Sequence, residues 1–232
     1  MKQRTKALGT LLAALLLLLT VLTSCASATP LYSKTDGTRT YAVHGGSRPK
    51  RIQVSENGTV VWKTRVSVDK TVGAQNGSYG LEILDLNFDG LSDIKLITSV
   101  NGSVMTNACY LQTANGSYEY SDELSRLCNV GVDAEQKAIF SFAHTYSADD
   151  VEYSDAKPSH TWSDITTAHV WENGALKPYR RVWLTYYSEH DVYCYSISDY
   201  SDLTEEFLDP DDTWMTPAEY QKTDFGFLYY FR

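Results

Sequence analysis

The sequence predicts an all-β fold, a small β-propeller-like arrangement of antiparallel hairpins, with a β-sandwich as the alternative. The first observation behind this prediction is a recurring Asn-Gly dipeptide between segments in which β-branched and aromatic residues alternate with polar ones. The second is that only residues 122–127 and 217–222 have a helical pattern, each of one or two turns. The Asn-Gly spacings are irregular, so they do not indicate a strict repeat.

Most of the Asn-Gly pairs are expected at hairpin tips, because these residues tolerate the positive φ angles of a type I′ turn. The clearest hairpin joins residues 51–56 to 59–66 through Asn57-Gly58, and a second joins 166–172 to the strand at 180–187 through Asn173-Gly174. Further Asn-Gly pairs lie at 76–77, 101–102 and 115–116, and further strands are expected at 40–44, 81–84, 94–97, 104–112, 118–120, 138–144, 192–198 and 225–231.

Residues 85 to 93 have the spacing of a calcium loop. Oxygen-bearing side chains stand at every second position, and Gly90 follows them where the chain must turn sharply. Calcium takes about six to eight oxygen ligands, and alternating donors in a tight loop supply them. The residues expected to bind Ca²⁺ are Asp85, Asn87, Asp89, Leu91 through its carbonyl oxygen, and Asp93.

The loop is not an EF-hand. An EF-hand has a helix on each side and a glutamate at loop position twelve, but Leu96 occupies that position and the flanking residues 81–84 and 94–97 have strand patterns. The alternative to a metal site is an Asp- and Asn-rich turn that binds no cation. We expect a bound Ca²⁺ to be structural, because the loop would order the connection between two strands.

The first residues predict export. Lys2, Arg4 and Lys6 precede an apolar run over 7–22, which is typical of a secretory signal peptide comprising residues 1–24. Leu22-Thr23-Ser24-Cys25 resembles a bacterial lipobox, which implies lipidation of Cys25 and attachment to a membrane; a plain secreted protein is the alternative. Residues 25–37 are then expected to be a tether and residues 38–232 a single all-β calcium-binding domain. The expected location is extracytoplasmic, lipid-anchored to a bacterial membrane.

The charge of the mature chain argues against nucleic acid as a partner. The chain has 20 Lys+Arg and 29 Asp+Glu, and residues 1–24 contain three of the cations and none of the acids. The mature net charge is therefore 17 minus 29, or −12. An acidic surface favours basic partners and divalent cations over the phosphate backbone of DNA or RNA, although the same charge also keeps an exported protein soluble.

No motif predicts an enzyme. The sequence has no Gly-x-Ser-x-Gly, His-Glu-x-x-His, phosphate loop or Cys-x-x-Cys. Five histidines are scattered without metal-ligand spacing, at His44, His144, His160, His169 and His190. With Cys25 lipidated, three thiols remain, and Cys109 with Cys128 is the pair closest in sequence and the candidate disulfide, although spacing does not fix the connectivity. Cys194 is expected to be a buried, inert thiol.

The segment Leu84 to Ile94 resembles the calcium loop of FG-GAP and VCBS repeats, which lie between propeller strands. More broadly, the order of hairpin, calcium loop and aromatic hairpin resembles exported bacterial proteins that carry one such loop, some of which are propeller-like inhibitors of lysozyme and other peptidoglycan hydrolases. This resemblance implies a membrane-anchored module that binds a macromolecule and inhibits a lysozyme-like enzyme. The alternatives are a lipoprotein that binds cell-wall carbohydrate and, third, an envelope hydrolase.

The aromatic content favours a binding role. The chain has 17 tyrosines and five tryptophans, and rigid amphipathic rings suit both protein interfaces and sugar stacking. Five tyrosines fall within one predicted hairpin region, Tyr186, Tyr187, Tyr193, Tyr195 and Tyr200. The alternation of a strand would send some of these rings into the core and leave others for recognition of a protein or a cell-wall glycan.

Overall fold

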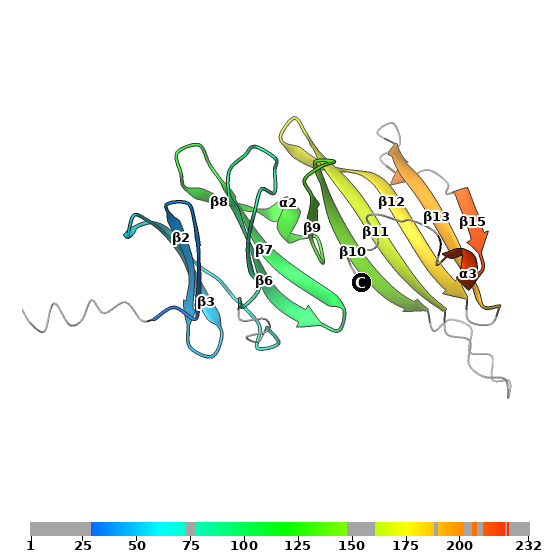
Figure 1. Ribbon diagram of the computed structural model, residues 1–232, viewed down its shortest axis with the longest axis horizontal. Helices are drawn as coiled ribbons and strands as arrows, with labels where there is room; N and C mark the ends of the chain where they lie inside the picture. Colours follow the sequence, from blue (N-terminus) through cyan, green and yellow to red (C-terminus); the bar gives the residue numbers. More distant parts are fainter. Residues whose placement is uncertain are drawn as a thin grey trace, which may run out of the picture.

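The computed structural model describes residues 29–72, 78–147, 161–187, 190–201, 206–207, 211–220 and 222. The all-β prediction is confirmed: these residues form three antiparallel sheets that follow one another along the long axis of the molecule (Figure 1). The described strands do not close into a propeller ring. Over the same residues, no helix is long and apolar enough to cross a membrane.

The first sheet, here called sheet A, is a four-stranded meander in the order β1-β2-β3-β4. Its strands are β1 (Tyr32–Asp36), β2 (Arg39–Gly45), β3 (Pro49–Glu56) and β4 (Thr59–Arg65). Asn57 and Gly58 join β3 to β4 with φ angles of 48° and 81°, as expected for a type I′ turn. The hairpin predicted from this dipeptide is therefore present.

Sheet B is a second four-stranded meander, in the order β5-β6-β7-β8. Its strands are β5 (Leu81–Leu84), β6 (Asp93–Asn101), β7 (Val104–Gln112) and β8 (Tyr118–Ser121), followed by the short helix α2 (Asp122–Ser125). Ser121 caps this helix by accepting a hydrogen bond from the Leu124 backbone N–H. The predicted short helix at 122–127 is thus confirmed in its first turn.

Sheet C has seven strands, in the order β14-β13-β12-β11-β10-β9, with β15 also pairing with β13. Its strands are β9 (Gly131–Asp133), β10 (Ala138–Ser147), β11 (Thr161–Glu172), β12 (Ala175–Tyr187), β13 (Val192–Ser201), β14 (Glu206–Phe207) and β15 (Asp211–Met215), and α3 (Pro217–Tyr220) follows β15. Asn173 and Gly174, with φ angles of 51° and 80°, form the tip between β11 and β12. The predictions for 76–77 and 225–231 lie outside the described residues.

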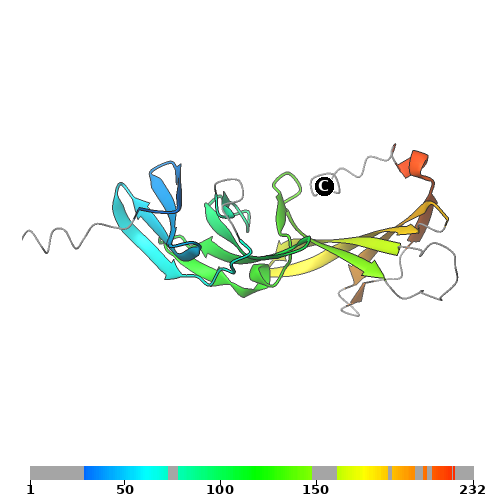
Figure 2. The same cartoon turned by 90° about the horizontal axis from the view of Figure 1, so that it is seen from below.

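Seen from below, the three sheets again follow one another along the molecule (Figure 2). Among the described residues the core forms three clusters, two on opposite faces of sheet B and a third within sheet C. Alternation along β7 decides which face each residue reaches. Ala108 and Tyr110 pack in the cluster shared with sheet A, whereas Cys109 and Leu111 pack in the cluster that includes Ile139 of sheet C. One cluster therefore joins sheet A to sheet B, and a second joins sheet B to sheet C.

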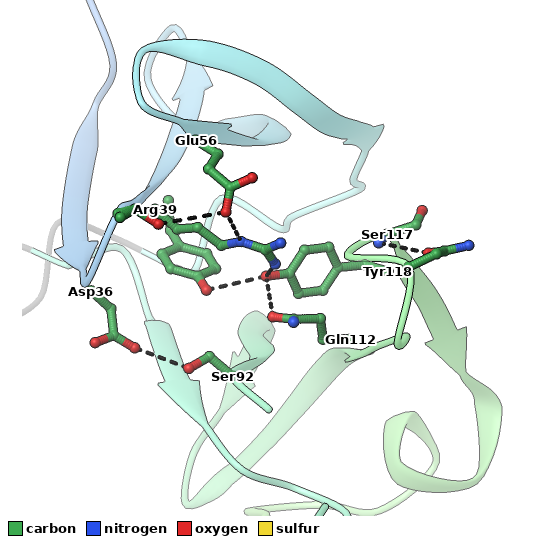
Figure 3. Close-up of polar contacts among 10 residues, drawn as sticks. Asp36, Arg39, Glu56, Ser92, Gln112, Ser117 and Tyr118 are labelled. Atoms are coloured by element: carbon green, nitrogen blue, oxygen red, sulfur yellow. Dashed lines mark hydrogen bonds and ion pairs between the residues drawn. The ribbon is translucent and has the colours of Figure 1, made fainter. Parts of the chain in front are cut away.

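A polar network joins sheets A and B at their edge (Figure 3). The hydroxyl of Tyr118 lies 3.1 Å from that of Tyr41, donates to Oε1 of Gln112 at 3.0 Å and accepts from Nη1 of Arg39 at 3.2 Å. Nε of Arg39 in turn donates to Oε1 of Glu56 at 3.3 Å. Burial raises the pKa of Tyr118, which keeps its phenol protonated throughout the physiological range.

Replacing Tyr118 by phenylalanine is expected to lower the free energy of unfolding by about 1 kcal/mol, because buried polar partners lose a hydrogen bond. Urea denaturation measures this change. Tyr120→Phe is the matched control, since that ring stands two residues along β8 and is 55% exposed. An equal loss in both variants would show that the network contributes nothing beyond ring packing.

His169 lies on β11 and is 7% exposed. Burial lowers the pKa of its imidazole, because the charged form loses hydration. The folded state therefore binds fewer protons than the unfolded state in the interval between the lowered pKa and the ordinary value of about 6.5. The contribution of His169 to the free energy of unfolding is therefore fully present above a pH of about 6.5, and it is lost as the pH falls below that value.

Denaturation between pH 5 and 8 is expected to show a smaller loss of stability at acid pH in His169→Gln than in the unmodified protein. The exposed His190, replaced in the same way, serves as the control. If both variants follow the unmodified protein, another group causes the acid sensitivity.

Two expectations require correction. The segment 25–37 is not entirely a tether, because β1 occupies Tyr32–Asp36 and pairs with β2. The hairpin turns at Gly37-Thr38, between the paired residues Asp36 and Arg39, and Gly37 has a φ of 57°.

The expected disulfide between Cys109 and Cys128 is not formed, and both cysteines are free. Cys128 forms an isolated β-bridge with Thr106. Thr106 precedes Cys109 by three positions in β7. Three residues of strand span about 10 Å and end on the opposite face, beyond the reach of a disulfide. Burial raises the pKa of Cys109 to about 12, so this thiol stays protonated and unreactive, as Cys194, which is also buried, was expected to be.

Candidate calcium loop and adjoining groove

The predicted calcium loop connects β5 to β6, and its acidic side chains fold back onto its own backbone. Asp85 accepts hydrogen bonds from the backbone N–H groups of Asp89 at 3.2 Å and Gly90 at 2.9 Å. Asp89 Oδ1 accepts from the Leu91 N–H at 2.8 Å. Phe88 and Gly90 take positive φ angles of 60° and 85°, which wind the chain around these carboxylates. The structure therefore brings Asp85, Asn87 and Asp89 together, with Nδ2 of Asn87 donating to Asp89 at 3.0 Å.

Asp93 holds the end of the loop from inside the protein. Its side chain is fully buried, and its Oδ2 and Oδ1 atoms accept from the backbone N–H groups of Leu86 and Gln112, each at 2.7 Å. Burial raises the pKa of this carboxyl to about 6, the two hydrogen bonds oppose that rise, and the nearby charges of Asp89 and Asp85 add to it. Asp93 thus braces the loop against β7, a function that its spacing in the sequence does not reveal.

The donor set has the chemistry that Ca²⁺ requires. It consists of carboxylate, amide and carbonyl oxygens, and three negative side chains lie close enough for two of them to raise the pKa of the third. Within the described part of the chain, no lysine or arginine forms an ion pair with Asp85, Asp89 or Asp93. Each carboxylate oxygen that accepts one amide hydrogen retains a second lone pair for a cation.

The side chains do not yet converge on one point. Among the described residues, no group of three or more His, Cys, Asp or Glu side chains is arranged to hold a metal ion. Hydrogen bonds from the loop amides hold Asp85 and Asp89, and those from Leu86 and Gln112 hold Asp93. The residues fit calcium in chemical type, and binding would require the carboxylates to turn inward.

The loop contacts all three sheets. Ser92 donates to the Asp36 carboxylate of sheet A at 2.9 Å (Figure 3), Asp93 is bonded to Gln112 of sheet B, and Nε1 of Trp171 in sheet C donates to the Leu86 carbonyl at 2.8 Å. Because the loop lies where the sheets meet, ordering it also fixes their junctions.

A groove of about 390 Å³ adjoins the loop between β7, β8 and the tip of β11. Asn87 of the loop lines it together with Gln112, Glu119, Tyr120, Glu123 and Trp171. Among the residues that the structure describes, no lysine or arginine lines this groove. Asp122, at its edge, is paired with Arg126. The groove combines an exposed ring with carboxylates and amides, groups that bind either cationic side chains or sugar hydroxyls.

The tyrosines of sheet C are divided between its faces. Tyr186 packs on Tyr193 with ring centroids 4.8 Å apart, and Tyr187 packs on Trp214 at 5.3 Å. All five tyrosines of the predicted group are partly exposed. The rings are therefore neither wholly core nor one continuous recognition face.

One pair of polar residues escaped the sequence analysis. His144 on β10 stands opposite Asp164 on β11, and Nδ1 of the imidazole contacts Oδ1 of the carboxylate. Only the pairing of the two strands brings these residues together, so no local motif marks them. Cys25, the predicted lipidation site, lies outside the described residues.

No protein-family model matches the sequence, and no curated protein matches it. Among solved structures, the chain is similar to one described as the structure of a Xanthomonas type IV secretion system related protein, with 15% sequence identity and a TM-score of 0.47. The similarity covers 77% of this chain and 92% of that one. A likeness at this level assigns neither a family nor a function.

Proposed function

We propose that this protein is an extracytoplasmic, membrane-anchored calcium-binding lipoprotein whose β domain binds a macromolecule, with lysozyme-like peptidoglycan hydrolases as the expected partners. The observation that carries the proposal is the wound loop at 85–93, whose three carboxylates have no cationic partner among the described residues and whose Asn87 also lines the acidic groove. Calcium would hold the loop, and the loop would hold one wall of the groove.

The charge of the groove supports a basic protein partner. Glu119 and Glu123 are exposed, and Tyr120 beside them is 55% exposed. Complementary charge speeds the encounter between proteins and disfavours wrong partners, while a rigid exposed ring supplies apolar contact area. Lysozyme, a basic enzyme, has the complementary surface.

The test is inhibition of lysozyme by purified residues 26–232 at low ionic strength, with calcium and with excess EDTA. We expect inhibition in calcium and weaker inhibition in EDTA. The double variant Glu119→Gln/Glu123→Gln should lose most of the inhibition, and Glu135→Gln, which alters an exposed acid outside the groove, should retain it. Equal inhibition by the unmodified protein, the double variant and Glu135→Gln would show that the groove does not bind lysozyme.

Cell-wall carbohydrate is the second candidate, favoured by Tyr120. Its ring packs against Tyr110 with centroids 5.5 Å apart and leaves one face exposed between carboxylate neighbours. Such a ring stacks on sugars, and the neighbouring carboxylates accept hydrogen bonds from the sugar hydroxyl groups. Retention on insoluble peptidoglycan without any enzyme, lost in Tyr120→Ala, would favour this function over inhibition.

A further inference from the structure

Sheet A contains a basic pocket in a protein that is otherwise acidic. The pocket has a volume of about 600 Å³ and lies where β2, β3 and the end of β4 meet. Its charged lining consists of Arg48, Lys50, Arg51 and Arg65, with His44 beside them and no Asp or Glu. Four cations around one pocket are unexpected in a mature chain of net charge −12.

Strand register places two of these cations directly opposite each other. Arg51 on β3 pairs with Arg65 on β4 and, on its other side, with His44 on β2. Directly opposed residues in an antiparallel sheet have Cβ atoms about 4.5 to 5.5 Å apart, and like charges in such pairs are destabilising. The three side chains thus form one row on a single face of the sheet.

Asp69 lies close enough to Arg48 for their charges to interact, but no acid lines the pocket itself in the described part of the chain. Over the described residues, Arg48, Lys50, Arg51 and Arg65 form no ion pair. Nε of Arg51 is buried and has no hydrogen-bond partner in the same part of the structure. A buried N–H donor without an acceptor costs free energy, and an anion bound in the pocket would satisfy it.

The bend between β2 and β3 shapes the pocket by bringing two backbone segments close together. A Cβ atom on Gly45 would lie 2.0 Å from the carbonyl oxygen of Arg48, so only glycine permits this approach. The register shift at His44 and Gly45 turns the segment that carries Arg48 toward the row. The cations therefore come from two segments, residues 48–51 and the end of β4, and His44 joins them from β2.

We propose that this pocket binds a phosphate group. Guanidinium groups match the oxygens of phosphate in paired hydrogen bonds, and several cations suit an anion with three or more acceptor oxygens better than a single carboxylate. The pocket lies beside the point where the chain enters the domain, because the Leu31 N–H donates to the carbonyl of Val43, next to His44, at 2.8 Å. Leu31 stands six positions after Cys25, a span of at most about 20 Å.

The phosphate has two available sources: the headgroup of an anionic membrane lipid near the anchor, or a soluble or polymeric phosphate ester. Only the lipid source rests on the proposed lipidation of Cys25. The pocket itself does not depend on the calcium loop, which lies in a different sheet. Measurements in EDTA therefore separate a failure of this proposal from a failure of the calcium site.

The experiment is titration calorimetry of the full-length protein in neutral detergent with EDTA, at low ionic strength. The probes are inorganic phosphate, glycerol 1-phosphate, dihexanoyl-phosphatidylglycerol and acetate. We expect the phosphates to bind more tightly than acetate, and Arg51→Gln and Arg65→Gln each to weaken binding by about tenfold, since one charge-assisted hydrogen bond is lost. Tighter binding of the lipid than of glycerol 1-phosphate identifies a headgroup, and equal binding identifies the phosphate ester alone.

Lys63→Gln is the matched control, because it removes an exposed cation from the same strand outside the pocket. The variant Arg65→Gln should unfold at the same or a higher temperature in phosphate-free buffer, since it relieves the repulsion from Arg51; this readout also shows that the variant is folded. The proposal is overturned if no phosphate binds, if acetate binds equally well, or if Lys63→Gln weakens binding as much as Arg51→Gln.

Discussion

Asp93→Ala is expected to lower the free energy of unfolding by about 3 kcal/mol, the largest effect of any single change considered for this protein. The buried carboxylate accepts from the Leu86 and Gln112 N–H groups at 2.7 Å each, and alanine would leave both donors without a partner. The loop would then separate from β7. Urea denaturation of residues 26–232 in EDTA measures this loss without any contribution from calcium.

Asp133→Ala is a close control for that prediction. The Asp133 carboxylate also accepts from two backbone N–H groups, those of Glu135 and Gln136, each at 2.9 Å, but in an exposed turn. Water replaces the lost acceptor there, so we expect a loss well below that of Asp93→Ala. Similar losses in the two variants would contradict the view that burial makes Asp93 the brace of the loop.

Asp89→Ala is expected to remove most of the calcium-dependent stabilisation while changing the stability in EDTA only slightly. Asp89 is exposed, and its side chain accepts hydrogen bonds from the Leu91 N–H and from Nδ2 of Asn87 within the same exposed loop. Extracellular calcium modules bind at about 10⁻⁴ to 10⁻³ M, so about 10 mM calcium should stabilise the unmodified protein by about 1.4 to 2.7 kcal/mol. Denaturation with and without calcium measures the difference.

Glu135→Ala removes an exposed acid far from the loop in sequence and should keep the full calcium response. Together, Asp93→Ala and Asp89→Ala separate two functions within one motif. The first change tests the structural brace, and the second tests the cation ligand. A calcium response that survives in Asp89→Ala would place the ion elsewhere.

The strand content could be predicted because its signals are local. Asn57-Gly58 and Asn173-Gly174 specify their turns through positive φ angles that few other residues accept, and alternation marks the strands on either side. β1 was missed because its polar residues, four of which are exposed, lack a buried face. Gly37, the first residue of its Gly37-Thr38 turn, was a local sign of the hairpin.

The candidate site could be predicted only in part, for a physical reason. The alternating donors of the calcium loop are neighbours in sequence, so their spacing alone identifies them. The groups that anchor the loop come from strands distant in the sequence: Asp36 on β1, Gln112 on β7 and Trp171 on β11. Tertiary packing brings these residues to the loop, and no periodicity in the chain encodes that packing.

The basic row of sheet A illustrates the same limit. Arg51 and Arg65 stand fourteen positions apart in the chain, and only the register of β3 with β4 makes them neighbours. The predicted disulfide was wrong for the converse reason. Cys109 and Cys128 are close in sequence, but this closeness does not place their side chains on one face of the sheet.

The most direct test of the proposed calcium site is thermal unfolding of residues 26–232 in excess EDTA, then in millimolar calcium, then in calcium with lysozyme. We predict a rise of several degrees with calcium, as expected for a ligand that binds only the folded state, and a further rise with lysozyme. A rise with calcium alone would support the loop and count against the inhibitor function. An unchanged unfolding temperature in calcium would contradict the central claim, because residues 85–93 would then be an acidic turn that binds no metal.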